Sequence, residues 1–327
     1  MAIQAAEIKC YKAETENDTV NNGGRMSTIE IADNVKNNLF PDVTEAERTA
    51  GKVQWRKVFW KICNAINEIA GAPVLNLAVP ATGDEYVEIF LGTADDIQSD
   101  SASFTDKAAC GKVATEAAAS SFELLVDVQS ADMTDAFTVG MPIVITVAAV
   151  DYYMKGLKAV SQDGVQYTLT LDDTDPLPVT VPVESVVSSA IEVADVSAEA
   201  SDMDDSGASG TFDDVTYPIV CDGIGTIDQT WTLTFTSSTA FGIVGDTVGA
   251  LAASSISVET APINPSFSVP YFTIPQAGWG VGWQNNDVVI FTTTAPTIPV
   301  WYRKTTPAGA GSVSADACTT TFRVTTA

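Results

Sequence analysis

Much of the chain alternates between apolar and polar residues with a period of two, which is the pattern of strands that bury one face. Apolar residues alternate along 165–171, and Trp231, Leu233 and Phe235 alternate with threonines. The dipeptide Asp163–Gly164 separates two such runs and predicts a tight hairpin turn. Short strands at this spacing predict a mainly β protein with two or more small β-barrel or β-sandwich domains.

The N-terminal part alone carries helix signals. Residues 27–40 place apolar side chains at near-helical spacing, and Pro41 would end that helix. A second, shorter helix is expected to begin near Thr44, because Thr44 and Glu47 fit a capping box and Gly51 supplies a stop. The sequence therefore predicts a short α-helical N-terminal segment beside the β domains.

The segment after this helix reads as a strand, because it is rich in β-branched and aromatic residues. Its letters, residues 52–63, are KVQWRKVFWKIC. Arg56 falls on one face of the strand with Val58, and Lys57 falls on the other with Phe59. Neither face is cleanly polar, so we expect a strand that is covered on both sides, with a neighbouring subunit as one candidate cover.

Changes in composition divide the chain into five parts. The predicted parts are a mixed α/β oligomerisation segment at 1–93, a linker or arm at 94–120, a β-barrel-like domain at 121–196, an acidic connector at 197–215, and a β-sandwich-like domain at 216–327.

The charge of the chain is strongly acidic and unevenly placed. The 327 residues carry a net charge of −26, yet 46% of them are hydrophobic, which is enough to build folded cores. Residues 1–61 are neutral, with nine basic and nine acidic residues, and the remaining residues carry the whole excess of acid. Such a surface repels phosphate, so we expect no specific binding of nucleic acid and no docking on anionic membranes.

The reactive side chains argue against catalysis. The chain has no histidine, which removes the commonest general base and the commonest metal ligand. Its cysteines lack the spacing of zinc sites or disulfide frameworks and are expected to be free thiols. They are Cys10, Cys63, Cys110, Cys221 and Cys318. No nucleophile elbow or phosphate-binding loop is present. The chain is therefore predicted not to be an enzyme, and to use no cofactor and no catalytic metal.

Two glycine-rich or acidic segments have alternative interpretations. Acidic residues between Asp202 and Asp213 match several positions of a calcium loop, but the twelfth residue is not Glu and the flanks read as strands. A solvated connector is the other interpretation, and the sequence does not decide between them.

Residues 278–283, GWGVGW, lack the context of a dinucleotide site and are interpreted as a loop in which Trp279 and Trp283 pack. Stacking of tryptophans on sugars stays open.

The basic residues gather near the N-terminus and again near residue 303. An ordinary solvated face is one explanation, and contact with an acidic surface of another copy is the other, because complementary patches fix register between subunits. The candidates for such intersubunit contacts are Arg48, Arg56, Lys57, Lys61, Arg303 and Lys304.

Both ends of the chain resemble a family of virion structural proteins of tailed bacteriophages and Mu-like prophages, encoded among head–tail and tail genes. The N-terminal segments are NNGGRMS and VKNNLFPDVTEAERTAGKVQWRKVF, and the C-terminal ones are VPYFTIPQAGWGVGWQNNDVVIFTT and PVWYRKTTPAGA. They cover roughly a third of the chain, and 94–210 matches only as generic β structure. The resemblance implies a virion component without specifying its ring of the particle.

Together these observations predict a neck protein, as a head–tail connector or collar, or a tail ring protein. It would be assembled in the bacterial host cytoplasm into six- or twelve-fold rings with itself and with neighbouring neck or tail proteins. DNA would pass through the ring without tight binding. The alternatives are a tail-tube or capsid-surface protein of the same virion, or a carbohydrate-binding protein for receptor recognition.

Overall fold

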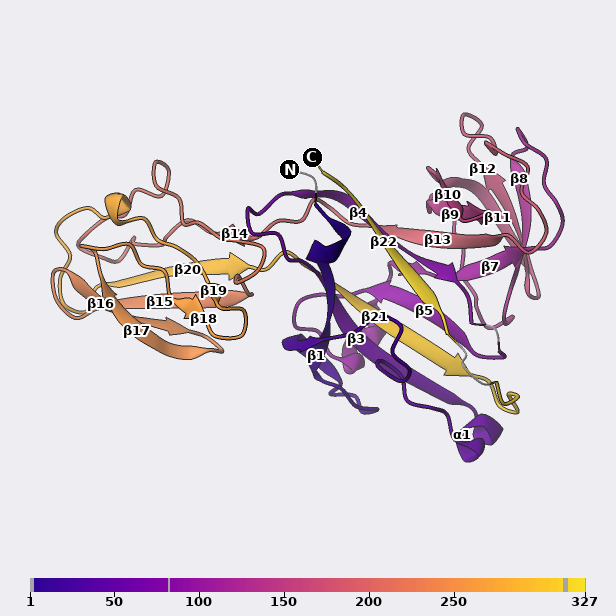
Figure 1. Cartoon of the computed structure of the whole chain (residues 1–327), viewed down its shortest axis with the longest axis horizontal. Coiled ribbons are helices and arrows are strands. Elements are labelled where there is room, and N and C mark those ends of the chain that lie inside the picture. The colour runs from indigo at the N-terminus through magenta and orange to yellow at the C-terminus, as the bar shows by residue number, and fades with distance from the viewer. Residues whose placement is uncertain (1–2, 82, 314–316, 327) are drawn as a thin grey trace.

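The computed structural model describes residues 3–81, 83–313 and 317–326 (Figure 1). The fold is mainly β, with several sheets and few helices, as predicted. The helical elements of the described residues are short. They are η1 (Ala5–Glu7), α1 (Glu45–Ala50), η2 (Gln98–Ser103) and η3 (Gln276–Gly278).

A six-stranded antiparallel sheet lies at the centre of the molecule in Figure 1, in the order β2-β1-β3-β21-β5-β6. Its strands are β1 (Ile8–Thr15), β2 (Gly23–Glu30), β3 (Lys52–Ile62), β5 (Tyr86–Leu91), β6 (Lys107–Ala108) and β21 (Thr297–Thr306). The sheet joins the beginning of the chain to its end, because β21 pairs with both β3 and β5.

A nine-stranded sheet extends to one side of this centre. Its main path is β10-β9-β13-β7-β8-β12-β11, and β4 joins β13 to β22. The strands are β4 (Ala70–Val79), β7 (Cys110–Val113), β8 (Glu123–Val128), β9 (Ile143–Val147), β10 (Val150–Met154), β11 (Leu157–Asp163), β12 (Gln166–Leu171), β13 (Val186–Glu192) and β22 (Thr319–Thr326). The predicted hairpin joins β11 to β12, and Gly164 has the positive φ of 61° that its turn needs.

A five-stranded sheet lies at the opposite end of the molecule, in the order β14-β20-β15-β16-β17 (Figure 1). Its strands are β14 (Glu199–Ala200), β15 (Gln229–Phe235), β16 (Ala240–Gly245), β17 (Gly249–Ser255) and β20 (Val288–Thr294), and β18 (Ile263–Asn264) pairs with β19 (Val269–Pro270) nearby. We call residues 197–294 the five-stranded lobe. Its inner face buries Trp231, Leu233 and Phe235, as the alternation predicted.

Strand β3 is covered on both faces, as expected from its sequence, but the cover comes from its own chain. On one face Val58 packs in a core with Leu75 and Val300. On the other face Phe59 packs with Tyr11 and Ala13. The apolar residues of both faces are therefore explained without a neighbouring subunit.

The prediction of a helix over residues 27–40 is wrong. Residues up to Glu30 form β2, which pairs with β1, and turns follow from Asp33. Asn34 and Asn37 adopt positive φ values of 58° and 60°, which a right-handed helix excludes. Pairing with β1 satisfies the backbone of this segment, so tertiary context overrides the helical spacing of its apolar residues. The shorter helix α1 is confirmed, with the capping box of Thr44 and Glu47 and with Gly51 at its end.

The predicted linker at 94–120 and the connector at 197–215 are both parts of sheets or cores. Strand β7 lies between β13 and β8, and the alanines before it are buried. Met203 and Phe212 belong to the core of the five-stranded lobe. The C-terminal part is divided as well, since β21 and β22 return to the other two sheets. The sequence did not indicate that these segments join sheets or cores, because both are rich in small or acidic residues. Such residues can pair through their backbones, but their side chains add little to the apolar alternation that predicts a strand.

Candidate functional site

The six cations predicted to meet another subunit lie on three elements. Arg48 is on α1, whereas Arg56, Lys57 and Lys61 are on β3, and Arg303 and Lys304 are on the neighbouring strand β21. Because side chains alternate along a strand, β3 sends Arg56 to one side of the sheet and Lys57 and Lys61 to the other. The six side chains therefore do not share one surface.

Arg56 fixes the turn between β1 and β2. The residue is 5% exposed, and its Nη1 donates to Asp18 Oδ1 at 2.7 Å and to the carbonyl of Asn17 at 3.0 Å. The guanidinium also lies over the ring of Phe40, with 5.7 Å between its Cζ and the ring centroid. A buried charge needs such partners, since desolvation would otherwise be costly.

Lys57 fixes the loop that follows β5. It is 3% exposed, and its Nζ lies 2.5 Å from Asp96 Oδ1 and donates to the carbonyls of Gly24 and Asp96 at 2.7 and 3.0 Å. Trp301 Nε1 donates to the same carboxylate at 3.1 Å. Burial lowers the pKa of Lys57, and the bond to Asp96 opposes that shift. The three hydrogens of the ammonium thus all have acceptors within this chain.

Lys61 joins the six-stranded sheet to the five-stranded lobe. It is fully buried, and its Nζ donates to the carbonyls of Ile224 and Thr226 at 2.9 and 3.0 Å. The ammonium lies 4.7 Å from the ring centroid of Phe267. Burial lowers the pKa of Lys61 to about 8, because the two acceptors are neutral carbonyls and desolvation disfavours the charged form.

Arg25, which the sequence did not single out, makes a second link to the same lobe. Its Nη2 lies 3.1 Å from Asp246 Oδ2, and its Nη1 donates to the carbonyl of Asp228 at 3.2 Å. Asn67 adds a pair of hydrogen bonds to the backbone of Ala198, each 2.7 Å long. Cations and amides of the first seventy residues therefore hold the acidic lobe of their own chain.

The second basic cluster also has its partners within the chain. Arg303 forms an ion pair with Glu88, whose side chain is fully buried and also receives Lys107 at 3.2 Å. Lys304 Nζ lies 3.4 Å from Glu85 Oε2. Arg48 Nη1 donates to the carbonyl of Val43 at 2.9 Å.

The intersubunit role predicted for Arg56, Lys57 and Lys61 is therefore wrong, because these side chains are buried and bonded inside one chain. Arg303 and Lys304 are also paired internally, with partners on the adjacent strand β5 or before it. The sequence revealed that basic residues gather in an otherwise acidic chain, but it did not reveal which groups these cations contact. The complementary acidic surface is on the same chain.

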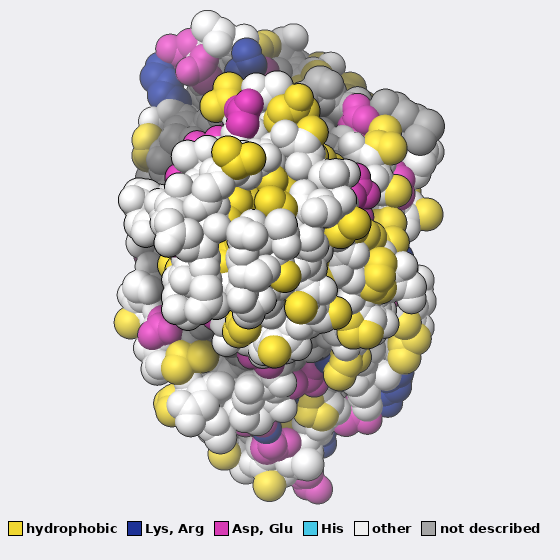
Figure 2. Space-filling model, turned by 90° about the vertical axis from the view of Figure 1, so that its left-hand side faces the viewer, with side chains coloured by type: hydrophobic (Ala, Val, Ile, Leu, Met, Phe, Trp, Pro, Cys, Tyr) yellow, Lys and Arg dark blue, Asp and Glu magenta, His cyan; other side chains and the backbone are white. Residues whose placement is uncertain are grey.

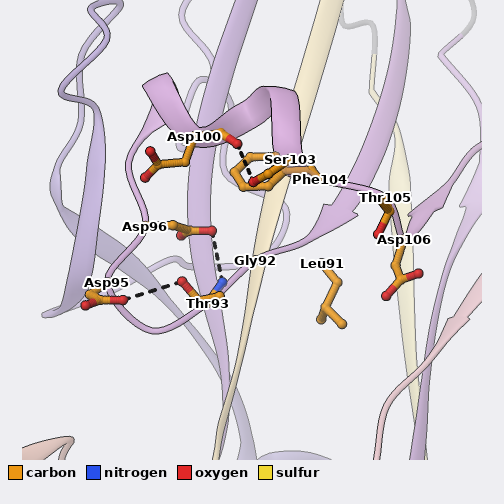
Figure 3. Close-up of a pocket in the computed structure, with 10 residues that line it drawn as sticks. All are labelled: Leu91, Gly92, Thr93, Asp95, Asp96, Asp100, Ser103, Phe104, Thr105 and Asp106. Atoms are coloured by element: carbon orange, nitrogen blue, oxygen red, sulfur yellow. Dashed lines mark hydrogen bonds between the residues drawn. The ribbon is translucent and has the colours of Figure 1, made fainter.

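An acidic pocket of about 510 Å³ lies between the end of β5 and η2 (Figure 3). Asp95, Asp96, Asp100 and Asp106 line it together with Phe104. Two of these four carboxylates accept hydrogen bonds from nearby backbone amides: Asp96 accepts from the amide of Thr93 at 2.9 Å, and Asp100 from that of Ile97 at 3.0 Å. The pocket is anionic, but no nucleophile paired with a base faces it among the residues that line it.

The acidic segment 202–213 is organised by its own backbone. Asp204 Oδ1 accepts from the amide of Ser206, Asp205 Oδ2 from that of Phe212, and Asp213 Oδ1 from that of Thr216. The carboxylates are thus used to stabilise turns. Across the described parts of the chain, no group of three or more Cys, Asp or Glu residues is arranged to hold a metal ion.

The glycine-rich segment GWGVGW is a packing loop, as interpreted. Trp283 stacks on Phe235 with 4.3 Å between ring centroids, and Trp279 meets Phe212 edge-on at 4.9 Å. A Cβ on Gly278 would lie 2.5 Å from the ring of Phe212, so the close approach requires glycine. All six tryptophans pack against another aromatic ring, and Trp231, Trp283 and Trp301 are also buried.

None of the five cysteines, all of which lie in the described parts of the chain, forms a disulfide. Burial raises the pKa of Cys10 and of Cys110 to about 12, and that of Cys221 to about 11. A thiol at such a pKa is almost entirely protonated at neutral pH and is a poor nucleophile. These side chains act as small apolar residues of the cores.

In three comparisons with known proteins, no family model, no curated protein and no solved structure matches the chain. No helix within the described residues is long and apolar enough to span a membrane.

Proposed function

We propose that this protein is a structural component of a tailed-phage virion, most specifically a neck or tail ring protein that assembles with its own copies and with neighbouring virion proteins. The observation that carries the proposal is the use made of its charged side chains. The candidate cations hold the parts of one chain together, and the acidic side chains of the loops cap turns. Neither set is arranged to turn over a substrate.

The acidic surface fits the passage of DNA through a ring. No lysine or arginine lies between Lys158 and Arg303, whereas that span contains eighteen acidic residues. Duplex DNA binds proteins largely through cations that replace its counterions. A channel lined by such a surface would repel the phosphates and leave the DNA free to move.

The proposal is tested on purified particles of the phage or prophage that encodes the chain. Quantitative mass spectrometry should find the full-length protein in a fixed ratio to the major capsid protein, and a C-terminal gold or antibody label should appear at the neck or along the tail by electron microscopy. A capsid-surface location would give label over the head. Absence of the protein from mature particles would overturn the proposal.

A further inference from the structure

The five-stranded lobe is joined to the rest of the chain without a shared strand or a shared hydrophobic core. Among the described residues, no strand of the lobe pairs with a strand outside it. The core of the lobe consists of residues between 198 and 291, and of its described side chains Phe267 alone packs against another core. Figure 1 shows the lobe at one end of the molecule, set apart from the six-stranded sheet. Units that pack separately in this way commonly move relative to each other.

Two short connections lead into and out of the lobe. Between Val196, which pairs with Ala70 outside the lobe, and the start of β14 lie residues 197–198. Residues 295–296 connect β20 to β21. Neither connection belongs to a helix or strand, so rotation of a few backbone dihedrals there moves the lobe as one body.

We call the contact of the lobe with the six-stranded sheet, together with these connections, the joint. Residues outside the lobe that bond across it include Arg25, Lys61, Asn64 and Asn67. The lobe contains eleven acidic and no basic residues. In Figure 2, which looks at this end of the molecule, Lys and Arg side chains lie towards the outline. Every cation that holds the lobe therefore comes from outside it.

Lys61 is enclosed in the joint with fewer partners than water would offer it. Its ammonium has three hydrogens, and the carbonyls of Ile224 and Thr226 accept from it while the ring of Phe267 lies beside it. Within the described residues, no carboxylate forms an ion pair with it. Separation of the lobe returns the ammonium to water, so the closed joint carries a desolvation cost that an open joint lacks.

From these observations we propose that the joint is a hinge and that Lys61 is its latch. The structure shows the hinge closed. In the open form the lobe swings off the six-stranded sheet as a folded body, about residues 197–198 and 295–296, and each side keeps its own core. Opening breaks only the bonds of the joint, and hydration of Lys61 offsets part of that loss. The hinge is a property of the single chain and does not depend on the proposed virion role.

The latch makes the hinge sensitive to pH. Burial lowers the pKa of Lys61 to about 8 in the closed joint, and release returns it towards 10.5. Above pH 8 the open form therefore binds more protons, so the ratio of closed to open form rises with pH. These values give a rise of about tenfold from pH 7 to pH 9.

Other titratable groups face the same contact. They are Lys9, Tyr11, Glu30, Cys63, Asp222 and Asp228. The thiol of Cys63 acts against Lys61, because burial raises its pKa above 9.0 and its thiolate favours the open form. Burial also raises the pKa of Tyr11, which acts in the same direction as Cys63. Both groups are present in Lys61→Met, so comparison of this variant with the wild type isolates the latch.

Amide hydrogen exchange of the full-length protein tests the hinge. The amides of Gly223 and Ala198 donate across the joint, whereas that of Leu233 lies inside the lobe, in β15. After correction for intrinsic exchange, Gly223 and Ala198 should share one opening constant, at least about tenfold larger than that of Leu233, because the lobe stays folded when the hinge opens. Equal constants at all three amides would overturn the hinge, since the lobe would then separate only by unfolding.

The role of the latch is tested by pH. In the wild type the opening constant of Gly223 should fall about tenfold from pH 7 to pH 9. This fall should be absent from Lys61→Met. Lys158→Met is the matched control, because Lys158 is an exposed lysine paired with Asp173, and it should behave like the wild type. The same fall in Lys61→Met as in the wild type would overturn the assignment of Lys61 as the latch.

Asn67→Gly separates one concerted opening from several local ones. Glycine keeps the positive φ of 52° at this position and removes both bonds to Ala198. The opening constant of Gly223 should rise at least about threefold, because both amides are released by the same movement. An unchanged constant at Gly223 would overturn the hinge, also where Lys61→Met fails to fold. Presence or absence of the protein in particles leaves these outcomes unaffected.

Discussion

At the scale of single residues, the unusual feature is the number of buried cations that donate hydrogen bonds to backbone carbonyls. Lys61 is the extreme case, because both of its acceptors are neutral and its ammonium is fully buried. A buried ammonium is stabilising only as far as its acceptors replace water. Its depressed pKa shows that they do so incompletely.

The pH dependence of stability should reveal this cost. The pKa of Lys61 falls from 10.5 in the unfolded chain to about 8 in the folded one. Between these values the unfolded state binds more protons, so the contribution of Lys61 to the free energy of unfolding rises with pH. The gain is at most about 3 kcal/mol from pH 8 to pH 10.5, because a difference of one in pKa corresponds to about 1.4 kcal/mol. Below pH 8 both states are protonated and the penalty is fully present.

Urea unfolding of the wild type and of Lys61→Met at pH 7.5 and pH 10 measures this effect. The difference between the two proteins cancels the titration of tyrosines and cysteines that they share. The wild type should gain stability relative to Lys61→Met at the higher pH. A difference that does not change with pH would contradict the assignment.

What the sequence could predict at this scale was the position of the cations, not their partners. The alternation along 52–62 correctly placed Arg56 and Lys57 on opposite faces of a strand. The partners lie far away in the sequence: Lys61 meets Thr226, and Arg303 meets Glu88. No local pattern links residues separated by 165 or 215 positions, so an internal partner could not be distinguished from a neighbouring subunit.

At the scale of elements, local signals were reliable where tertiary contacts are few. Helix α1 has no buried residue, and its ends follow its own caps. The amide of Thr44 donates to Glu47 Oε2 at 2.8 Å, and the amide of Glu47 donates to Thr44 Oγ1 at 3.3 Å. In 27–40, by contrast, pairing with β1 decides the structure. Helical spacing is a weak predictor when a free sheet edge competes for the same backbone.

Removal of the cap should therefore loosen α1 locally. Thr44→Ala should lower the free energy of opening of this helix by about 1 kcal/mol, the usual effect of losing a threonine cap. Amide hydrogen exchange at residues 45–50 measures it. Thr49→Ala is the control, because Thr49 lies inside the helix and its hydroxyl donates to the carbonyl of Glu45. Equal protection in Thr44→Ala and in the wild type would show that the capping box does not stabilise the helix.

At the scale of the whole molecule, the general class was predictable and the connections were not. Strand periodicity correctly indicated a mainly β fold, because strands such as β12 and β15 bury alternate residues on one face. The sequence did not reveal that β21 lies between β3 and β5, since strand partners far apart along the chain leave no local signal. The six-stranded sheet at the centre is therefore built from both ends of the chain. The domain boundaries predicted from composition separate strands that belong to this one sheet.

The six-stranded sheet and the five-stranded lobe meet at a joint where the backbones are so close that one added methyl group should disturb the contact. The amide of Gly223 donates to the carbonyl of Asn64 at 2.9 Å, and a Cβ at Gly223 would lie 2.5 Å from the carbonyl oxygen of Ile62. Gly223→Ala should thus push the lobe away from β3. We expect a melting temperature lower by several degrees and faster cleavage near the joint in limited proteolysis.

Gly207→Ala is the matched control for this change, because Gly207 is in the same lobe and a Cβ there would meet no atom of a non-adjacent residue within 4 Å. It should melt and be cleaved like the wild type. If Gly223→Ala behaved in the same way as Gly207→Ala, the joint would not be the close contact described above.

The placement of β21 has a consequence for synthesis in the cell. Strands β3 and β5 leave the ribosome early, but the strand that fills the space between them is made more than two hundred residues later. At ordinary translation rates that delay is on the order of ten seconds or more. During it, two long strand edges lack their partner. A prematurely terminated chain never closes this gap, so only finished polypeptides present a completed central sheet.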